Sequence, residues 1–132
     1  MNQSNDIERQ LSYAGHRFSH PYICTQMSSE ILMVYCTCPD EEVAKSISTH
    51  LVERGLAGCV NRIPGLTSVY KWEGEMKSGT EVLLLIKTPA DRRAALTAEL
   101  VKIHPYELPE IIAVPVTGGH QPYLDWIEDC TR

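Results

Sequence analysis

Residues 66–87 read LTSVYKWEGEMKSGTEVLLLIK, and their pattern indicates two neighbouring antiparallel strands, which is the most informative signal for the fold. Residues 68–72 alternate between two faces, with the period of two that a strand shows. Residues 80–87 are rich in valine, leucine and isoleucine and form the expected returning strand. Residues 74–79 begin and end with glycine and are expected to connect the two strands. The sequence therefore predicts a long β-hairpin with a connection of about five or six residues.

The segments on either side of the hairpin complete a regular order of elements. An apolar run at 31–37 has the composition of a buried strand, and apolar residues every three or four positions mark helices. The expected strands are 31–37, 59–63 with its continuation beyond Pro64-Gly65, 80–87 and 110–116. Three helices are expected. The first buries Val43, Ile47 and Leu51, the second Leu96, Leu100 and Ile103, and the third Tyr123, Trp126, Ile127 and Cys130. The order β-α-β-β-α-β plus a helix predicts an α+β, ferredoxin-like fold, an antiparallel sheet with two helices on one face.

Prolines and short polar residues indicate where the two central helices begin and end. Pro39 suits the first turn of the first helix, and the acidic residues after it face the positive end of the helix dipole. Thr88 is expected to cap the second helix, with Pro89 at its first position and Asp91 reaching back. Pro105 disfavours helical geometry in the residue before it, so the second helix is expected to end there.

The composition is that of one globular domain. The 132 residues are 43% hydrophobic and 22% charged, which is usual for such a domain. No apolar run approaches the roughly 20 residues that cross a bilayer. No secretory signal pattern opens the sequence, and the cysteine count of five is odd, which argues against a disulfide framework. We therefore expect a cytoplasmic protein with no membrane partner.

The net charge bears on the expected partners, and residues 1–28 bear on the extent of the folded domain. The formal net charge is −5, and lysines and arginines are scattered, so no nucleic-acid partner is expected. Residues 1–28 are largely polar, and their aromatic residues follow no helical or strand period. We expect 1–28 to be a disordered tail and 29–132 to be the folded domain.

The predicted hairpin also bears on assembly. Its strands are longer than two helices of three or four turns would cover, so Tyr70, Trp72 and Met76 are expected near an overhang. Isolated hairpins are marginal in water and leave unpaired strand edges. One interpretation is a mobile hairpin with a few surface aromatic residues. We favour the other, in which the hairpin lies in an interface between identical subunits.

Three stretches of sequence together resemble the CutA divalent-cation-tolerance family. They are VYCTCPD at 34–40, IPGLTSVYKWEG at 63–74 and IHPYELPEI at 103–111, the last followed by VPV at 114–116 and YLDW at 123–126. The resemblance covers roughly residues 30–130, in the order and spacing of the family. It implies a homotrimer of ferredoxin-like subunits with an architecture similar to the PII signalling proteins. It also implies a link to copper and other divalent metal ions, as in bacterial members of the family, for which no general catalytic activity is established.

The candidate metal ligands are Cys36, His104 and Glu110. The resemblance carries Cys36 as a metal-site position, and Cys38 lies two residues on, so both sulfurs can face one ligand. Soft thiolates favour copper(I) and zinc, and a neutral imidazole binds copper or zinc. The structural alternatives are a buried core cysteine for Cys36, a helix-start residue for Cys38, a histidine bonded to helix-terminal carbonyls for His104 and an interface ion pair for Glu110.

One position departs from the family pattern. Copper-associated bacterial members carry two consecutive histidines before Pro-Tyr, and this sequence has Ile103 where the first would be. An isoleucine side chain has no ligand atom, so we expect weak or differently shaped copper or divalent-metal binding.

Other classes of function fit less well. A PII-like trimeric sensor with a small molecule between subunits stays open, although no glycine-rich phosphate loop is present. A soft-metal chaperone domain uses Cys-x-x-Cys, whereas the spacing here is Cys36-x-Cys38. An enzyme is not expected, because the histidines are dispersed and no Gly-x-Ser-x-Gly or His-Glu-x-x-His occurs.

Overall fold

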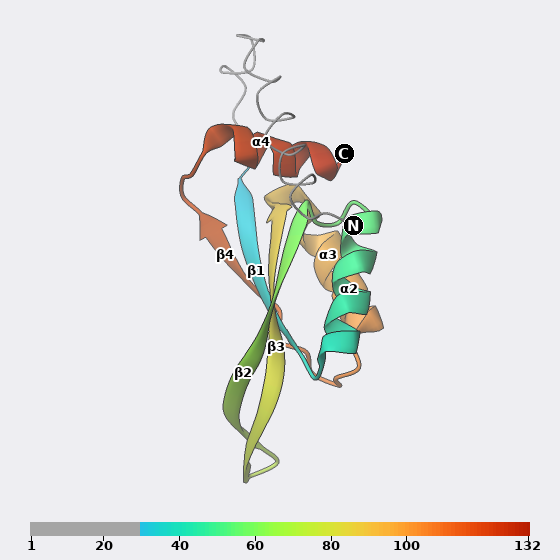
Figure 1. Cartoon of the computed structure of the whole chain (residues 1–132), viewed down its shortest axis with the longest axis vertical. Coiled ribbons are helices and arrows are strands. Elements are labelled where there is room, and N and C mark those ends of the chain that lie inside the picture. The colour runs from blue at the N-terminus through green and yellow to red at the C-terminus, as the bar shows by residue number, and fades with distance from the viewer. Residues whose placement is uncertain (1–29) are drawn as a thin grey trace, which may run out of the picture.

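The computed structural model describes residues 30–132, so the tail expected at 1–28 lies outside the described residues. A four-stranded antiparallel sheet forms its centre, in the order β2-β3-β1-β4 (Figure 1). The strands are β1 (Ile31–Cys38), β2 (Cys59–Trp72), β3 (Glu75–Pro89) and β4 (Ile112–Val116). This order confirms the expected ferredoxin-like arrangement, and β2 and β4 are the edge strands.

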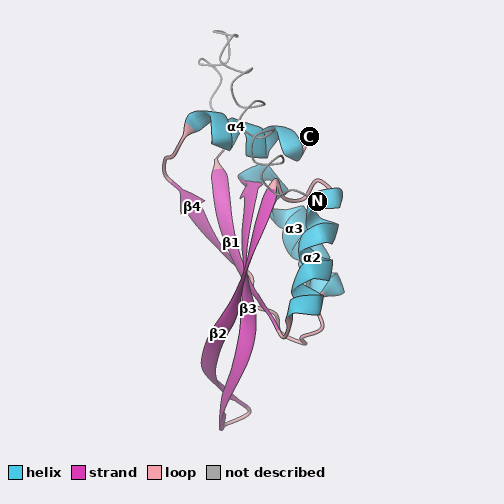
Figure 2. Cartoon of the chain, in the orientation of Figure 1, coloured by secondary structure: helices cyan, strands magenta, loops and turns pink. Residues whose placement is uncertain are grey.

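Within the described residues, three α-helices pack against the sheet. They are α2 (Glu41–Glu53), α3 (Arg93–Ile103) and α4 (Gln121–Cys130). The first two lie side by side over one face, as the sequence predicts, and α4 crosses the end of the sheet opposite the hairpin turn (Figure 2). The described chain therefore has one sheet face covered by helices and another that no helix covers over most of its length.

The hydrophobic core lies between the sheet and the paired helices. Alternate residues of β1 and β3 point toward the helices, because successive side chains in a strand point to opposite faces. The largest contributions are Leu32, Val34, Cys36 and Cys38 from β1, Val82, Leu84 and Ile86 from β3, Ile47 and Leu51 from α2, and Leu96 and Leu100 from α3. Val43 and Ile103, expected in the core, only pack against its margin, and Ala44 is the fully buried residue of the first turn of α2.

The hairpin is tighter than the sequence indicates. Trp72 pairs with Glu75, which leaves Glu73 and Gly74 as a two-residue turn. The expected connection of five or six residues is therefore wrong. Glu73 has a φ of 50° and Gly74 a φ of 81°, and positive φ at both central residues defines a type I′ turn. Its usual sequences are Asn-Gly and Asp-Gly, so Glu-Gly gives a weak signal.

The hairpin extends well beyond the ends of α2 and α3 (Figure 1). Val69, Tyr70 and Met76 are at least half exposed there, and Trp72 is 38% exposed. The predicted overhang is confirmed for a single chain. Nearer the sheet, β2 stays one strand through Pro64-Gly65, where its register with β3 shifts between Ile63 and Leu66.

The helix boundaries correct two details. Asp40 caps α2 by accepting the Val43 N–H at 2.8 Å, so Pro39 lies before the helix and not in its first turn. Thr88 does not cap α3, because its hydroxyl donates to the Leu56 carbonyl at 2.8 Å. Strand β3 runs on to Pro89, and a 3₁₀ turn, η3 (Ala90–Arg92), leads into α3.

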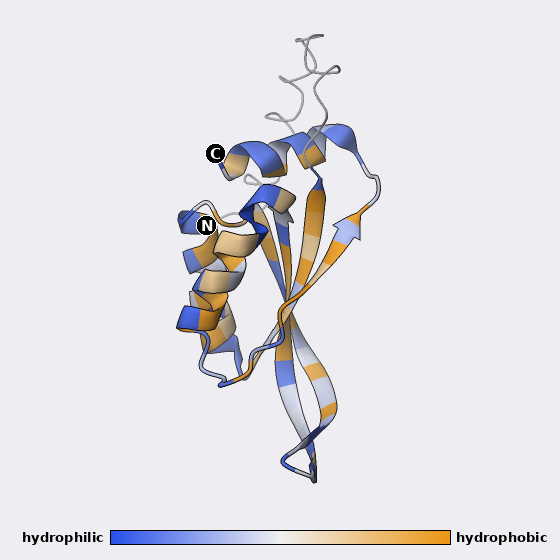
Figure 3. Cartoon of the chain, turned by 180° about the vertical axis from the view of Figure 1, so that it is seen from behind, coloured by the Kyte–Doolittle hydropathy of each residue, from blue (hydrophilic) through white to orange (hydrophobic). Residues whose placement is uncertain are grey.

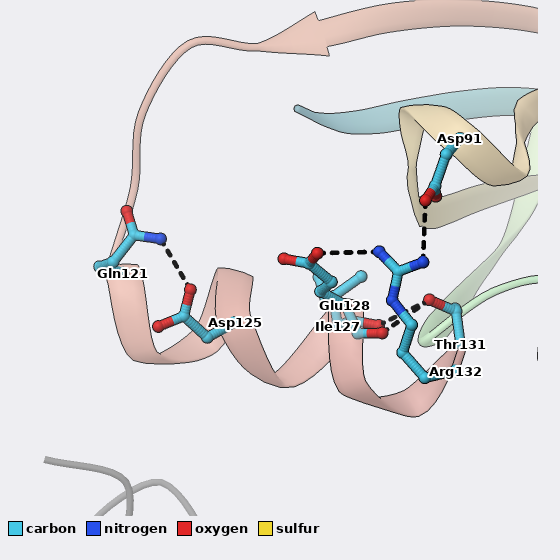
Figure 4. Close-up of polar contacts among 7 residues, drawn as sticks. All are labelled: Asp91, Gln121, Asp125, Ile127, Glu128, Thr131 and Arg132. Atoms are coloured by element: carbon cyan, nitrogen blue, oxygen red, sulfur yellow. Dashed lines mark hydrogen bonds and ion pairs between the residues drawn. The ribbon is translucent and has the colours of Figure 1, made fainter. Parts of the chain in front are cut away.

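Polar contacts stabilise α4 and join its C-terminal end to η3. The Arg132 guanidinium donates to Asp91 and Glu128, each at 2.8 Å, and Gln121 donates to Asp125 (Figure 4). The bonds to Asp91 and Glu128 raise the pKa of Arg132. Asp91 thus binds Arg132 and does not reach back to a capping residue. The predicted apolar face of α4 holds for Ile127, which is buried, but Cys130 is exposed.

The face of the sheet away from α2 and α3 is apolar. The register places Tyr35 of β1 between Leu85 of β3 and Ile112 of β4. We call this surface the open face, and its apolar residues are Met33, Tyr35, Ile63, Leu83, Leu85, Ile112 and Val114, all partly or largely exposed. Apolar residues line the strands above the hairpin in Figure 3. Lys87, at the upper end of this face, donates to the Tyr123 hydroxyl of α4 at 3.1 Å.

Candidate metal centre

Two cysteines and one histidine meet where β1 ends. Cys36 and Cys38 are two residues apart on an extended strand, so both thiols point into the helix-covered core, and neither is exposed. His104 follows the last residue of α3 and is 7% exposed. One ligand atom from each of the three residues lies within 4.8 Å of the others. The structure thus brings the expected Cys36 and His104 together and adds Cys38.

The two thiols interact directly. The hydrogen bond to Cys38 raises the pKa of Cys36 far above its usual value, and burial raises it further. The same hydrogen bond lowers the pKa of Cys38, and it outweighs the opposing effect of burial. Of the two thiols, Cys38 is therefore the one whose thiolate form the pairing favours. Thiolate is the form in which cysteine binds metal.

His104 is held by hydrogen bonds at both ring nitrogens. Nε2 lies 2.9 Å from the carbonyl oxygen of Thr37, which accepts hydrogen bonds only, so Nε2 carries the proton. Nδ1 accepts the backbone N–H of Tyr106 at 3.1 Å. The carbonyl belongs to β1 and not to a helix end, which differs from the structural alternative considered for this histidine.

A polar network continues from His104 toward the hairpin. The Tyr106 ring lies 4.7 Å from that of His104, and its hydroxyl donates to Glu81 of β3 at 2.8 Å. Burial raises the pKa of Glu81, but hydrogen bonds from Ser68, Tyr106 and Thr37 outweigh burial and lower it overall. Burial and the bond to Glu81 raise the pKa of Tyr106. Sequence reasoning missed Glu81, because a single glutamate in a strand carries no signal of this network.

Glu110 and Ile103 lie outside the three-residue cluster. Glu110 is exposed, in the segment between α3 and β4, and its charge contributes to the raised pKa of Cys36. Its role as a ligand stays a prediction. Ile103 is the last residue of α3 and packs against the core. The cluster therefore contains one imidazole where the copper-associated pattern has two.

The donor set selects among metal ions. Two thiols and an imidazole suit soft and borderline ions such as copper and zinc, and they do not suit magnesium or calcium, which require oxygen ligands. Metal–sulfur bonds of about 2.3 Å place two sulfurs on one ion no more than about 4.6 Å apart. The spacing of the cluster, within 4.8 Å, is close to this limit, so side-chain rotations of a few tenths of an ångström suffice to bring both sulfurs onto one ion. The residues present thus fit copper or zinc.

Comparisons with known proteins agree with this fold. The chain is 48% identical over 103 residues to the Protein CutA homolog of Xenopus laevis, which covers 78% of this chain and 68% of that protein. It is 47% identical over 98 residues to human Protein CutA, covering 74% of this chain but only 55% of that protein. The solved structure of the divalent cation tolerance protein Cut A1 from Thermus thermophilus superposes with a TM-score of 0.75 at 45% identity, over 77% of this chain and 99% of that one. A family model described as CutA1 divalent ion tolerance protein matches residues 32–130, and the chain belongs to that family.

Proposed function

We propose that this protein acts in tolerance of divalent cations as a cytoplasmic homotrimer that binds copper or another divalent ion. Cys36 and His104 are the ligands in this proposal, and Glu110 approaches as a further ligand when the ion is bound. The observation that carries the proposal is the meeting of buried sulfur and nitrogen donors within 4.8 Å. The proposal gives this cluster a binding role and no catalytic one.

The open face supports the trimer. Its apolar side chains form a continuous surface over all four strands of a single chain, and large exposed apolar patches usually mark interaction sites. Two edge strands, β2 and β4, also carry unpaired backbone groups. A second and third copy of this chain would cover the open face, both edges and the aromatic residues of the hairpin together.

The proposed cytoplasmic location is supported by the cysteines of the chain. Within residues 30–132, no helix is both long and apolar enough to span a bilayer. A solved relative from Archaeoglobus fulgidus is described as a periplasmic divalent cation tolerance protein. The cysteines support the cytoplasm, because Cys36 and Cys38 are free thiols and thiols persist in a reducing compartment.

Anaerobic calorimetry with Zn²⁺ and Cu²⁺ tests the metal part. We expect one ion per subunit, with affinity reduced at least about tenfold in His104→Ala. His120→Ala is the matched control, because His120 is an exposed histidine at the start of α4 and should bind as the native chain does. Glu110→Gln shows whether the carboxylate contributes.

Equal affinity of native protein and His104→Ala would remove His104 from the site. Because this side chain is buried and holds Thr37, thermal unfolding of the variant must show a folded protein. His104→Gln provides a second variant that keeps a side-chain donor at this position. A native chain that binds neither ion would overturn the metal part of the proposal.

A further inference from the structure

We propose that Cys59 and Lys87 form a modification site, in which hydrogen peroxide oxidises the thiol and the lysine amine then closes a covalent sulfur–nitrogen bond between β2 and β3. Such a bond is a sulfenamide, and it is called the cross-strand link below. The inference goes beyond the proposed function, because neither residue belongs to the cluster of Cys36, Cys38 and His104.

The strand register places the two residues directly opposite each other. Cys59 is the first residue of β2, and its partner in the antiparallel ladder is Lys87 of β3. The Gly58 N–H donates to the Lys87 carbonyl at 2.9 Å and holds this register. Directly opposite residues point to the same face of a sheet, with Cβ atoms about 4.5–5.5 Å apart. The thiol and the lysine side chain are therefore neighbours in the folded chain.

Both side chains lie on the sheet face away from the core. Ile86, next to Lys87, is fully buried in the core, and successive side chains of a strand point to opposite faces. Cys59 and Lys87 are both partly exposed. Reactive cysteines typically lie in partly exposed sites beside a lysine or another cation. The surroundings of Cys59 match this description.

Tyr123 of α4 contacts both members of the pair. Lys87 Nζ donates to the Tyr123 hydroxyl at 3.1 Å and lies 5.3 Å from the centroid of its ring. Burial raises the pKa of Tyr123 and outweighs the bond from Lys87, and a hydrogen bond to Cys59 acts in the same direction as burial. Stacking on Trp126, with ring centroids 5.7 Å apart, holds the Tyr123 ring. Tyr123 is thus a positioning residue that keeps the amine beside the thiol.

The first step of the modification oxidises the sulfur. The Cys59 sulfur attacks one oxygen of hydrogen peroxide and the O–O bond breaks. The attacked oxygen stays on sulfur as a hydroxyl, and the other hydroxyl leaves as water with the thiol proton. The product is a sulfenic acid, in which sulfur is oxidised by two electrons and the peroxide is reduced.

The second step closes the cross-strand link. The Lys87 amine, after it releases its extra proton to solvent, attacks the sulfur, and the S–O bond breaks. The hydroxyl leaves as a second water with one amine proton, as when a sulfenic acid condenses with another nitrogen to a sulfenamide. The linked chain has two hydrogen atoms fewer than the reduced chain. Two molecules of a thiol reductant restore the thiol and the amine and become a disulfide.

Peptide mapping of the full chain after treatment with hydrogen peroxide tests the inference. The treatment includes a metal chelator, so that metal ions generate no other oxidant, and free thiols are alkylated before digestion with trypsin. We expect peptide 55–62 joined to peptide 78–92, without cleavage after Lys87 and with a mass two hydrogen atoms below their sum. Treatment with dithiothreitol should separate the two peptides.

Variants identify the role of each side chain. Lys87→Arg keeps the positive charge and removes the primary amine, so it should lose the cross-strand link and accumulate the Cys59 sulfenic acid, which dimedone traps. Tyr123→Phe should shift the product from the link toward the dimedone adduct. Cys130→Ala is the matched control, since Cys130 is an exposed cysteine at the end of α4, and it should form the link as the native chain does. Circular dichroism confirms that each variant is folded.

Three results would overturn the inference. They are a native chain that gives only the dimedone adduct, a Cys59 that stays reduced while Cys130 is oxidised, and a link that persists in Lys87→Arg. The metal titrations of the proposed function do not depend on these results. The metal proposal and the cross-strand link can therefore fail separately.

Discussion

At the scale of single residues, Gly58 sets how closely α4 approaches the sheet. Its backbone N–H donates to the Lys87 carbonyl at 2.9 Å, which joins the start of β2 to β3. A Cβ built on Gly58 would lie 2.9 Å from the Cα of Ile127 and 3.0 Å from its carbonyl oxygen. These are backbone atoms of α4, so a side chain at this position would push the whole helix outward.

We therefore expect Gly58→Ala to lower the free energy of unfolding by about 1–3 kcal/mol, as overpacking does. Urea unfolding followed by circular dichroism measures the change. Gly118→Ala is the control, because a Cβ there has no atom within 4 Å, and it should change stability by less than about 0.5 kcal/mol. Equal stability of the two variants would show that α4 does not need this close approach.

Part of the candidate site was predictable from single residues of the sequence. Cys36 and His104 were predictable, because a known motif surrounds each of them, and the structure brings them together. The bond from His104 to Thr37 was not, since it joins residues 67 positions apart through a backbone carbonyl that every residue has. Hydrogen bonds to the main chain leave little trace in the sequence.

At the scale of elements, the hairpin turn is the clearest case of local geometry that the sequence obscures. The strands were predictable from alternation, but Glu73 in a left-handed conformation was not, because glutamate is uncommon there. The pairing of Trp72 with Glu75 continues the ladder to the last possible residue. Cross-strand pairing therefore overrides the local preference of Glu73.

The geometry of the turn predicts opposite effects of two substitutions on the free energy of unfolding. Gly74→Ala should lower the free energy of unfolding by about 1–2 kcal/mol, because alanine is strained at a φ of 81°. Glu73→Asn should raise it, since Asn-Gly is the preferred type I′ sequence. Gly79→Ala, in the same hairpin with open space around its Cβ and no positive φ, is the control. Denaturant unfolding of the three variants at one protein concentration measures these effects, and a Gly74→Ala chain as stable as the control would exclude a strained turn.

The paired helices give a prediction about pH. His50 of α2 and Glu99 of α3 lie 2.8 Å apart, and this hydrogen bond lowers the pKa of Glu99. A carboxyl whose folded pKa is depressed stabilises the fold above its unfolded pKa, and this contribution disappears as pH falls through the folded value. Glu99→Gln should therefore be less stable than the native chain at pH 7, by a small amount because solvent still reaches both side chains.

The difference between native and Glu99→Gln chains should shrink as the pH falls below about 4.3, the usual pKa of glutamate. Urea unfolding of both chains at pH 7 and at stepwise lower pH measures it. A difference that is constant across that range would assign the effect of the substitution to packing and not to the charge.

At the scale of the whole molecule, the open face is the main apolar surface that a single chain leaves uncovered. Val114 of β4 is 42% exposed on it, so a charge there costs a lone subunit little but would be buried in a trimer. We expect the native chain to sediment as a trimer at micromolar concentration and Val114→Glu to shift it toward monomer. Leu108→Glu, at a residue 72% exposed outside the strands, should leave the trimer intact. A native chain that is monomeric at that concentration would overturn the trimer.

The overall architecture was predictable because each element has its own periodic signal. The order of strands and the two helices on one face followed from patterns a few residues long. The ends of the elements did not, since Thr88 and Asp91 find partners at Leu56 and Arg132 that only the folded chain brings near. Local patterns thus determine the topology, and tertiary contacts determine the boundaries.

The central place of β1 has a consequence for synthesis of the chain. Among the strands of residues 30–132, β1 is the first to be synthesised, and it is bordered by β3 on one side and by β4, the last of them, on the other. Ile31 meets Val116 across that second border. Until the final strand is available, β1 presents a free edge, so nascent or truncated chains that stop before residue 112 should depend on chaperones to escape aggregation.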